Sequence, residues 1–340
     1  MNAAIPIKKI QYWLLTLLVL VGIIIIVGGL TRLTDSGLSM VDWRPIMGII
    51  PPITASAWQQ VFEQYQQFPE YQQLNQGMSL SEFKSIFLWE YSHRILGRIL
   101  GLVSILGLAH FWAYKQLTPI LKRQGLTIIG LIITQGLLGW YMVKSGLVDQ
   151  PDVSHFRLAA HLCLAFICIA YILHTLVGLI SSKKPKSQWL YQRTWTLSIL
   201  MFLQLIYGAF MGGLKAGLVS HTFPKMGAHF LPPIALAKSP FWLNFIENPF
   251  MIHFIHRSLG WVLLSMILIT LIQGYRQNKV PNTPLFWMTG LIFAQFILGI
   301  ATVLYQVPIS LAALHQWLGL LSISVIWAIN RAHRPPLMTR

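Results

Sequence analysis

At 340 residues, with 55% hydrophobic and only 10% charged side chains and a mean hydropathy of +0.61, the chain has too few polar groups to cover a water-soluble globule. Its net charge of +16 would indicate a nucleic-acid partner in a soluble basic domain, but here the basic residues stand between apolar runs, so membrane topology explains them and no nucleic acid is expected. The two cysteines, Cys163 and Cys168, exclude a disulfide framework and a cysteine-based metal cluster.

Eight segments are predominantly apolar over about 20 residues, the length that a helix needs to cross a bilayer. They are residues 11–30, 86–114, 125–143, 157–180, 189–213, 250–273, 284–305 and 311–329. The sequence therefore predicts an all-α integral membrane protein with eight transmembrane helices. Two connections, 31–85 and 214–249, are long, and we expect them to cap a site on their side of the membrane.

The charges predict the orientation of these helices. Basic residues gather in the even-numbered connections and the tail: Lys115, Lys122, Arg123, Lys183, Lys184, Lys186, Arg193, Arg276, Lys279, Arg331, Arg334 and Arg340. The positive-inside rule then places both termini in the cytoplasm. The acidic residues agree with this orientation, because all nine lie on or next to the odd-numbered, outward connections. They are Asp35, Asp42, Glu63, Glu70, Glu82, Glu90, Asp149, Asp152 and Glu247.

The second half of the chain repeats the first. Counterparts are Gly28-Gly29-Leu30 and Gly212-Gly213-Leu214, Pro45-Ile46-Met47-Gly48 and Pro224-Lys225-Met226-Gly227, Pro51-Pro52 and Pro232-Pro233, Gln135 and Gln295, and Gly139 and Gly299. Because four helices separate the copies, both copies have the same orientation in the membrane. We expect two pseudo-symmetric four-helix bundles, residues 1–182 and 183–340, related by an axis along the membrane normal.

The repeat also singles out four histidines near the outer ends of even-numbered helices: His93 and His161 in the first half, His256 and His315 in the second. A single histidine in a span is usually a hydrogen-bonded interface residue, but four at matching positions favour a functional role. Two histidines from facing helices can hold a haem between them, whereas zinc usually requires further protein ligands. The pattern predicts one bis-histidine haem site in each bundle.

Arginines next to these histidines strengthen the prediction. Arg94 and Arg257 follow repeat histidines, and arginine pairs with carboxylates such as haem propionates. For Arg98 and Arg157 the sequence leaves a headgroup contact equally open. His110 and His174 have no repeat counterparts and are interpreted as ordinary residues.

The two halves differ most at Glu90, whose repeat counterpart is His253. Glu90 lies one turn before His93 on the same helix face, where it could exchange protons beside the cofactor. The first bundle is therefore predicted to hold the reaction site, and the second a permanently bound haem.

Two motifs stand out in the sequence. The first runs from Gly28 to Pro52 and includes GGLTRLT, Ser36-Gly37-Leu38-Ser39, Trp43, Pro45 and Pro51-Pro52, and the second is Glu90-Tyr91-x-His93-Arg94. With these motifs the chain resembles the haem A synthase family over nearly its whole length. This resemblance implies oxidation of the C8 methyl group of haem o to the formyl group of haem a for cytochrome oxidase. It implies that His93 and His161 face the substrate haem, that Glu90 serves the reaction, and that His256 and His315 ligate a haem b cofactor.

The chain lacks the cysteine pair that many family members carry in an outer loop, so it is similar to the cysteine-free branch of proteobacteria and mitochondria, and a thiol relay is not expected. The resemblance further implies a bacterial inner membrane location with haem sites near the periplasmic side. Expected partners are the lipid bilayer, haem o synthase, an electron acceptor and further copies of the chain.

Two other functions fit parts of the pattern. A non-catalytic bis-histidine haem b carrier would share the haem sites but has no use for Glu90. A transporter would explain the repeat, but it predicts binding groups near the bilayer midplane rather than near the outer face.

Overall fold

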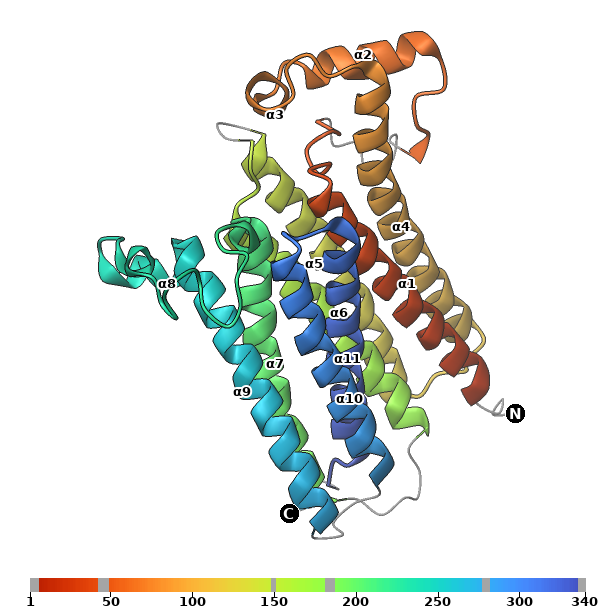
Figure 1. Cartoon of the computed structure of the whole chain (residues 1–340). Helices are drawn as coiled ribbons and strands as arrows, with labels where there is room; N and C mark the ends of the chain where they lie inside the picture. The colour runs from red at the N-terminus through yellow and green to blue at the C-terminus, as the bar shows by residue number, and fades with distance from the viewer. Residues whose placement is uncertain (1–5, 42–48, 148–150, 181–186, 277–281, 336–340) are drawn as a thin grey trace. The chain divides into compact units, whose positions relative to one another are not determined.

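The computed structural model describes residues 6–41, 49–147, 151–180, 187–276 and 282–335 (Figure 1). Within these ranges the chain is almost entirely helical, and the strand pattern is limited to one isolated bridge between Met226 and His229. Asp42, Asp149 and the predicted domain boundary at 182/183 lie outside the described residues.

Within the described ranges, eight helices are long and apolar enough to cross a membrane. They are α1 (Ile7–Leu33), α4 (Leu80–Ala113), α5 (Pro119–Val143), α6 (His155–Ile180), α7 (Gln188–Gly213), α9 (Pro249–Arg276), α10 (Asn282–Leu304) and α11 (Ile309–Ala332). The predicted all-α membrane fold with eight spans is thereby confirmed.

The helices separate into two compact units, and α1 and α6 each contribute to both. The first unit contains residues 19–165, and the second contains residues 6–18 and 166–335. In the second unit α7 packs on α9 and α11, and α10 packs on the same two helices, so these four form a closed four-helix bundle. In the first unit α4 packs along α5.

Helix α4 begins at Leu80 rather than near residue 86, because its start has its own cap. Ser79 accepts a hydrogen bond from the backbone N–H of Glu82 at 3.3 Å, and the Glu82 carboxylate accepts one from the backbone N–H of Ser79 at 2.8 Å. This capping box satisfies two backbone donors that the helix itself cannot pair. His93 therefore lies more than three turns inside α4.

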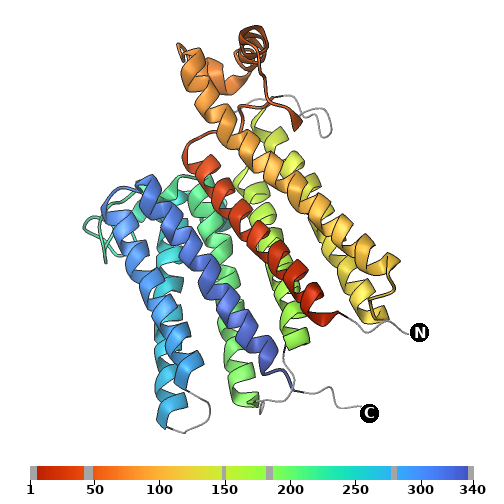
Figure 2. The same ribbon diagram turned by 90° about the vertical axis from the view of Figure 1, so that its right-hand side faces the viewer.

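The connection before α4 is folded rather than a plain loop. It forms α2 (Ala55–Tyr65) and α3 (Pro69–Gln73), which lie at the start of α4 in both views (Figure 2). Their core is an aromatic cluster of Phe62, Tyr65, Phe83 and Phe87. The aromatic rings bury the additional turns of α4, which explains why the helix extends beyond its apolar span.

Glu70 is buried in this connection with only 4% of its surface exposed. The Tyr65 hydroxyl donates to its carboxylate at 2.9 Å, and Asn75 donates to the Tyr65 oxygen at 2.7 Å. Burial raises the pKa of Glu70 to about 7, and burial also raises the pKa of the Tyr65 hydroxyl above its ordinary value. The connection thus contains a carboxyl group that titrates near neutral pH.

Candidate haem sites

The second unit brings His256 of α9 and His315 of α11 together inside its bundle. Their ring centroids are 6.5 Å apart, with an angle of 75° between the ring planes. Two imidazoles that bind one metal ion from opposite sides, each through a bond of about 2.0–2.1 Å, have centroids separated by roughly 6–6.5 Å. The pair predicted from the repeat therefore has the separation that bis-histidine ligation of a haem iron requires.

Glycines on the neighbouring helices make room for these two rings. A Cβ atom added at Gly208 of α7 would lie 3.3 Å from Cε1 of His256, and one added at Gly299 of α10 would lie 2.9 Å from Cε1 of His315. Because real Cβ atoms essentially never approach below 3.0 Å, a side chain at Gly299 would displace the ring. His315 thus lies in a notch that only glycine leaves open, whereas a Cβ atom at Gly208 would press more lightly on His256.

In the first unit, His93 of α4 and His161 of α6 also lie against glycines of neighbouring helices. A Cβ atom at Gly28 of α1 would lie 2.9 Å from Nε2 of His93, and one at Gly139 of α5 would lie 2.9 Å from Cε1 of His161. Gly139 and Gly299 are repeat counterparts, so the same notch serves both units.

Glutamines accompany three of the four rings. The amide nitrogens of Gln135, Gln204 and Gln295 lie 3.3 Å from Nε2 of His161, His256 and His315 respectively. Gln135 and Gln295 are repeat counterparts, but the position of Gln204 is Leu20 in the first half. Gln204 was not predicted from the sequence, although a glutamine within an apolar span is a usable signal. His93 lacks this glutamine, so the two sites are not equivalent.

Glu90 is the centre of a buried hydrogen-bond network. Its Oε2 accepts hydrogen bonds from the Ser39 hydroxyl at 2.7 Å and from the Met40 backbone N–H at 2.8 Å. Its Oε1 pairs with Arg94 at 2.5 Å, and the exposed side-chain fractions are 4% for Glu90 and 13% for Arg94. A buried carboxylate with three donors is held in one position and attaches the segment after α1 to α4. Sequence analysis did not identify Ser39 as its partner.

The two repeat arginines both contact backbone carbonyls in the connection that follows the first helix of their unit. Arg94 donates to the Met40 carbonyl at 2.9 Å, and Arg257 donates to the carbonyls of Thr222 and Lys225 at 3.4 and 3.3 Å. The propionate role predicted for them stays a prediction. Arg94 and Arg98 also line a pocket of about 270 Å³ between α4 and α2.

The remaining predicted residues lie as follows. Arg157 donates to the Tyr141 carbonyl at 2.8 Å and lies over the Tyr141 ring. His253 is 1% exposed in α9, and His110 contacts the Phe111 and Tyr114 rings in the last turns of α4. Among the residues that the structure describes, no group of three or more His, Cys, Asp or Glu side chains could hold a metal ion. The assignment of the paired histidines to haem stays a prediction.

Comparison with known proteins identifies the family of the chain. Residues 11–327 match the family described as cytochrome oxidase assembly protein, COX15-CtaA. The chain is 43% identical to the "Heme A synthase" of Bartonella bacilliformis, across 91% of this chain and 88% of the relative. It is 40% identical to the "Heme A synthase" of Nitrosospira multiformis (96% and 94%) and 42% identical to "Heme A synthase COX15" of Mus musculus (97% and 83%). The chain therefore belongs to the COX15-CtaA family of cytochrome oxidase assembly proteins.

Proposed function

We propose that this protein is a haem A synthase, a membrane oxidoreductase that converts the C8 methyl group of haem o into the formyl group of haem a. The relatives that carry this name match nearly the whole chain. The observation that carries the proposal is the presence of two repeat-related histidine pairs with different surroundings, Glu90 beside one and His253 beside the other. A non-catalytic carrier would need neither this difference nor the network that holds Glu90.

The second unit is proposed to hold haem b, and His256 and His315 are the residues that would bind its iron. Their 6.5 Å centroid separation and the notches at Gly208 and Gly299 support this assignment. When bound, a haem at this position supplies one-electron transfer. Conversion of a methyl group to a formyl group removes four electrons, so the reaction needs such a carrier and an external acceptor.

The first unit is proposed to bind the substrate, with His93 and His161 facing haem o. Glu90 serves the reaction from a fixed position, because Ser39, Met40 and Arg94 hold its carboxylate. Protons are released as the methyl group is oxidised, and Glu90 is the acid–base group next to His93. Arg94 and Arg257 are proposed to interact with the propionates of the two haems.

The proposed setting is the bacterial inner membrane, with both termini in the cytoplasm and both haem sites near the periplasmic side. The charge distribution along the sequence supports this orientation. The proposed bundles are residues 1–182 for the substrate and 183–340 for haem b. Haem o synthase, which makes the substrate, is the proposed partner, together with an electron acceptor and further copies of the chain.

Co-expression with a haem o synthase, followed by extraction and identification of the haems, tests the assignment. A haem A synthase yields haem a alongside haem b, and haem o accumulates when the reaction is blocked. Extraction of haem b alone under all conditions would instead identify a non-catalytic carrier.

A further inference from the structure

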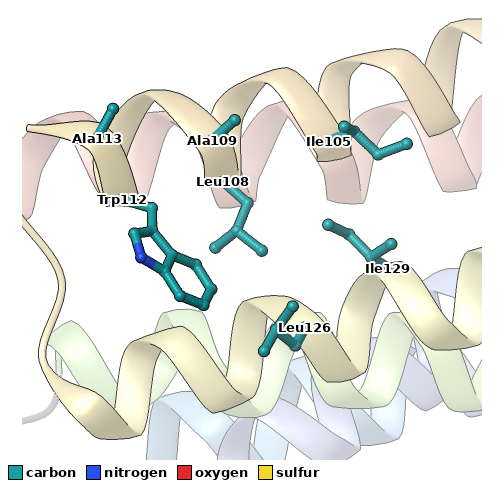
Figure 3. Close-up of a pocket in the computed structure, with 7 residues that line it drawn as sticks. All are labelled: Ile105, Leu108, Ala109, Trp112, Ala113, Leu126 and Ile129. Carbon is teal, nitrogen blue, oxygen red and sulfur yellow. The ribbon is translucent and has the colours of Figure 1, made fainter.

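An apolar groove of about 470 Å³ lies between α4 and α5, in the same unit as His93 (Figure 3). The side chains of Leu108 and Trp112 point from α4 toward α5, and Leu126 and Ile129 line the opposite side. Ala109 of α4 also lines the groove. All the described lining residues are apolar, so the groove suits a hydrocarbon chain rather than a polar ligand.

One row of α4 residues connects His93 to this groove. His93, Gly97, Gly101 and Ile105 follow each other at intervals of four, which places them along one ridge of the helix surface. A Cβ atom at Gly97 or Gly101 would meet no atom of the described chain within 4 Å. The ridge is therefore a shallow open track, and Ile105 and Trp112 lie about 18 and 28 Å beyond His93 along the helix axis.

The chemistry of the substrate in the proposed function matches this layout. Haem o carries two charged propionates on one edge and a long farnesyl-type hydrocarbon tail toward the opposite edge. The polar groups beside His93 are Glu90, Arg94 and Ser39, on the side of the unit that carries α2 and α3. A haem with its propionates toward that side points its tail edge along α4 toward the groove.

We infer that the groove between α4 and α5 binds the farnesyl-type tail of the haem substrate and thereby selects the methyl group that is oxidised. Two orientations of the porphyrin keep both propionates on the polar side, and a half-turn exchanges them. This half-turn swaps the C8 methyl with the methyl beside the other propionate. Only the tail distinguishes the two orientations strongly, so a groove on one side of the site fixes the C8 methyl at the reaction position.

This inference rests on the proposed function, and filling the groove tests it. Ala109→Trp places a large ring among the lining residues, and Ala109→Leu is a milder version. Leu106→Trp is the matched control on the same helix, because Leu106 is 58% exposed and is not among the described residues that line the groove. The spectrum of the resident haem reports whether each variant has folded.

The first measurement is the affinity of the protein, with its resident haem in place, for haem o and for haem b, which has no tail. Optical titration measures both affinities. The natural chain and Leu106→Trp are expected to bind haem o about tenfold more tightly than haem b, because the tail gains packing contacts. Ala109→Trp is expected to bind both haems equally, and Ala109→Leu to show an intermediate preference. Equal binding of haem o by the natural chain and by Ala109→Trp would overturn the inference and leave the groove to lipid acyl chains.

The second measurement is the position of the formyl group in the product, determined by mass spectrometry and NMR. The natural chain is expected to give the C8 product alone, and Ala109→Trp a mixture of two formyl isomers. A single C8 isomer from Ala109→Trp at the natural rate would contradict the inference. Failure of the proposed function can be told apart from failure of this inference. If the proposed function is wrong, the natural chain forms no formyl haem, but the titration still shows whether the groove recognises the tail.

Discussion

The imidazole rings of His256 and His315 lie 6.5 Å apart between centroids, on two helices of one closed bundle. The two residues are 59 positions apart in the chain. Each has a histidine as its repeat counterpart in the first half. This separation is what two axial ligands of one haem iron require.

Replacement of His256 by alanine removes one axial ligand of the proposed haem b. We expect His256→Ala to lose the low-spin b-type spectrum, because a single histidine cannot keep the iron six-coordinate. Absorbance spectroscopy of the purified protein measures this change. His229→Ala, at an exposed histidine of the same unit, is the control and should keep the spectrum. An unchanged spectrum in His256→Ala would remove the ligand assignment.

Gly139→Ala tests the notch beside His161. The added methyl group would lie 2.9 Å from Cε1 of that ring, so the ring has to move. We expect haem a formation to fall by about tenfold, the effect of roughly 1–2 kcal/mol of overpacking. Gly136→Ala on the same helix is the matched control, since its Cβ would meet nothing of the described chain within 4 Å. Equal loss of activity in both variants would indicate a general helix effect.

Glu90→Ala is expected to stop haem a formation and to leave the low-spin spectrum of haem b intact. Ser39→Ala removes one of the three donors to the carboxylate and should reduce formation by roughly ten- to a hundredfold, because a displaced group is costly to catalysis. The measurement is haem a per chain after co-expression with haem o synthase. Ser92→Ala, on the exposed side of α4, serves as control. Natural conversion in Glu90→Ala would exclude a role for this residue.

The connection containing α2 and α3 should lose stability as the pH rises. Burial raises the pKa of Glu70 from its ordinary 4.5 to about 7, so the folded segment binds this proton more tightly than the unfolded one does. Its contribution to stability is complete below about pH 4.5 and is lost as the pH rises through about 7. Hydrogen exchange of residues 55–75, corrected for intrinsic rates, should therefore accelerate between pH 5 and about 8. Glu70→Gln should remove this dependence, and a slope equal to that of the natural chain would contradict the assignment.

The parts of the fold that depend on the length of apolar segments were predictable from the sequence. The parts that depend on contacts between distant side chains were not. The eight spans follow from runs of about 20 apolar residues. Helices α2 and α3, in the connection before α4, do not follow from such runs. They depend on the packing of Tyr65 and Phe62 against Phe83, and no local sequence pattern links these residues. The early start of α4 was readable in principle from Ser79 and Glu82, which form a capping box.

The candidate sites divide in the same way. The repeat identified His93, His161, His256 and His315, and also the glycine at positions 139 and 299, because equal positions in two copies are visible in one sequence. Ser39 and Gln204 were missed. Ser39 reaches Glu90 across 51 residues, and Gln204 has no counterpart in the first half, so only the folded chain brings them to the sites.

The two histidine pairs are proposed to have different tasks, and haem analysis of two double variants separates these tasks. Each variant is co-expressed with haem o synthase, purified, and its haems are extracted and quantified per chain. His93→Ala with His161→Ala is predicted to retain haem b and to form no haem a, and His256→Ala with His315→Ala is predicted to lose haem b. Loss of haem b from the first variant and its retention in the second would contradict the account.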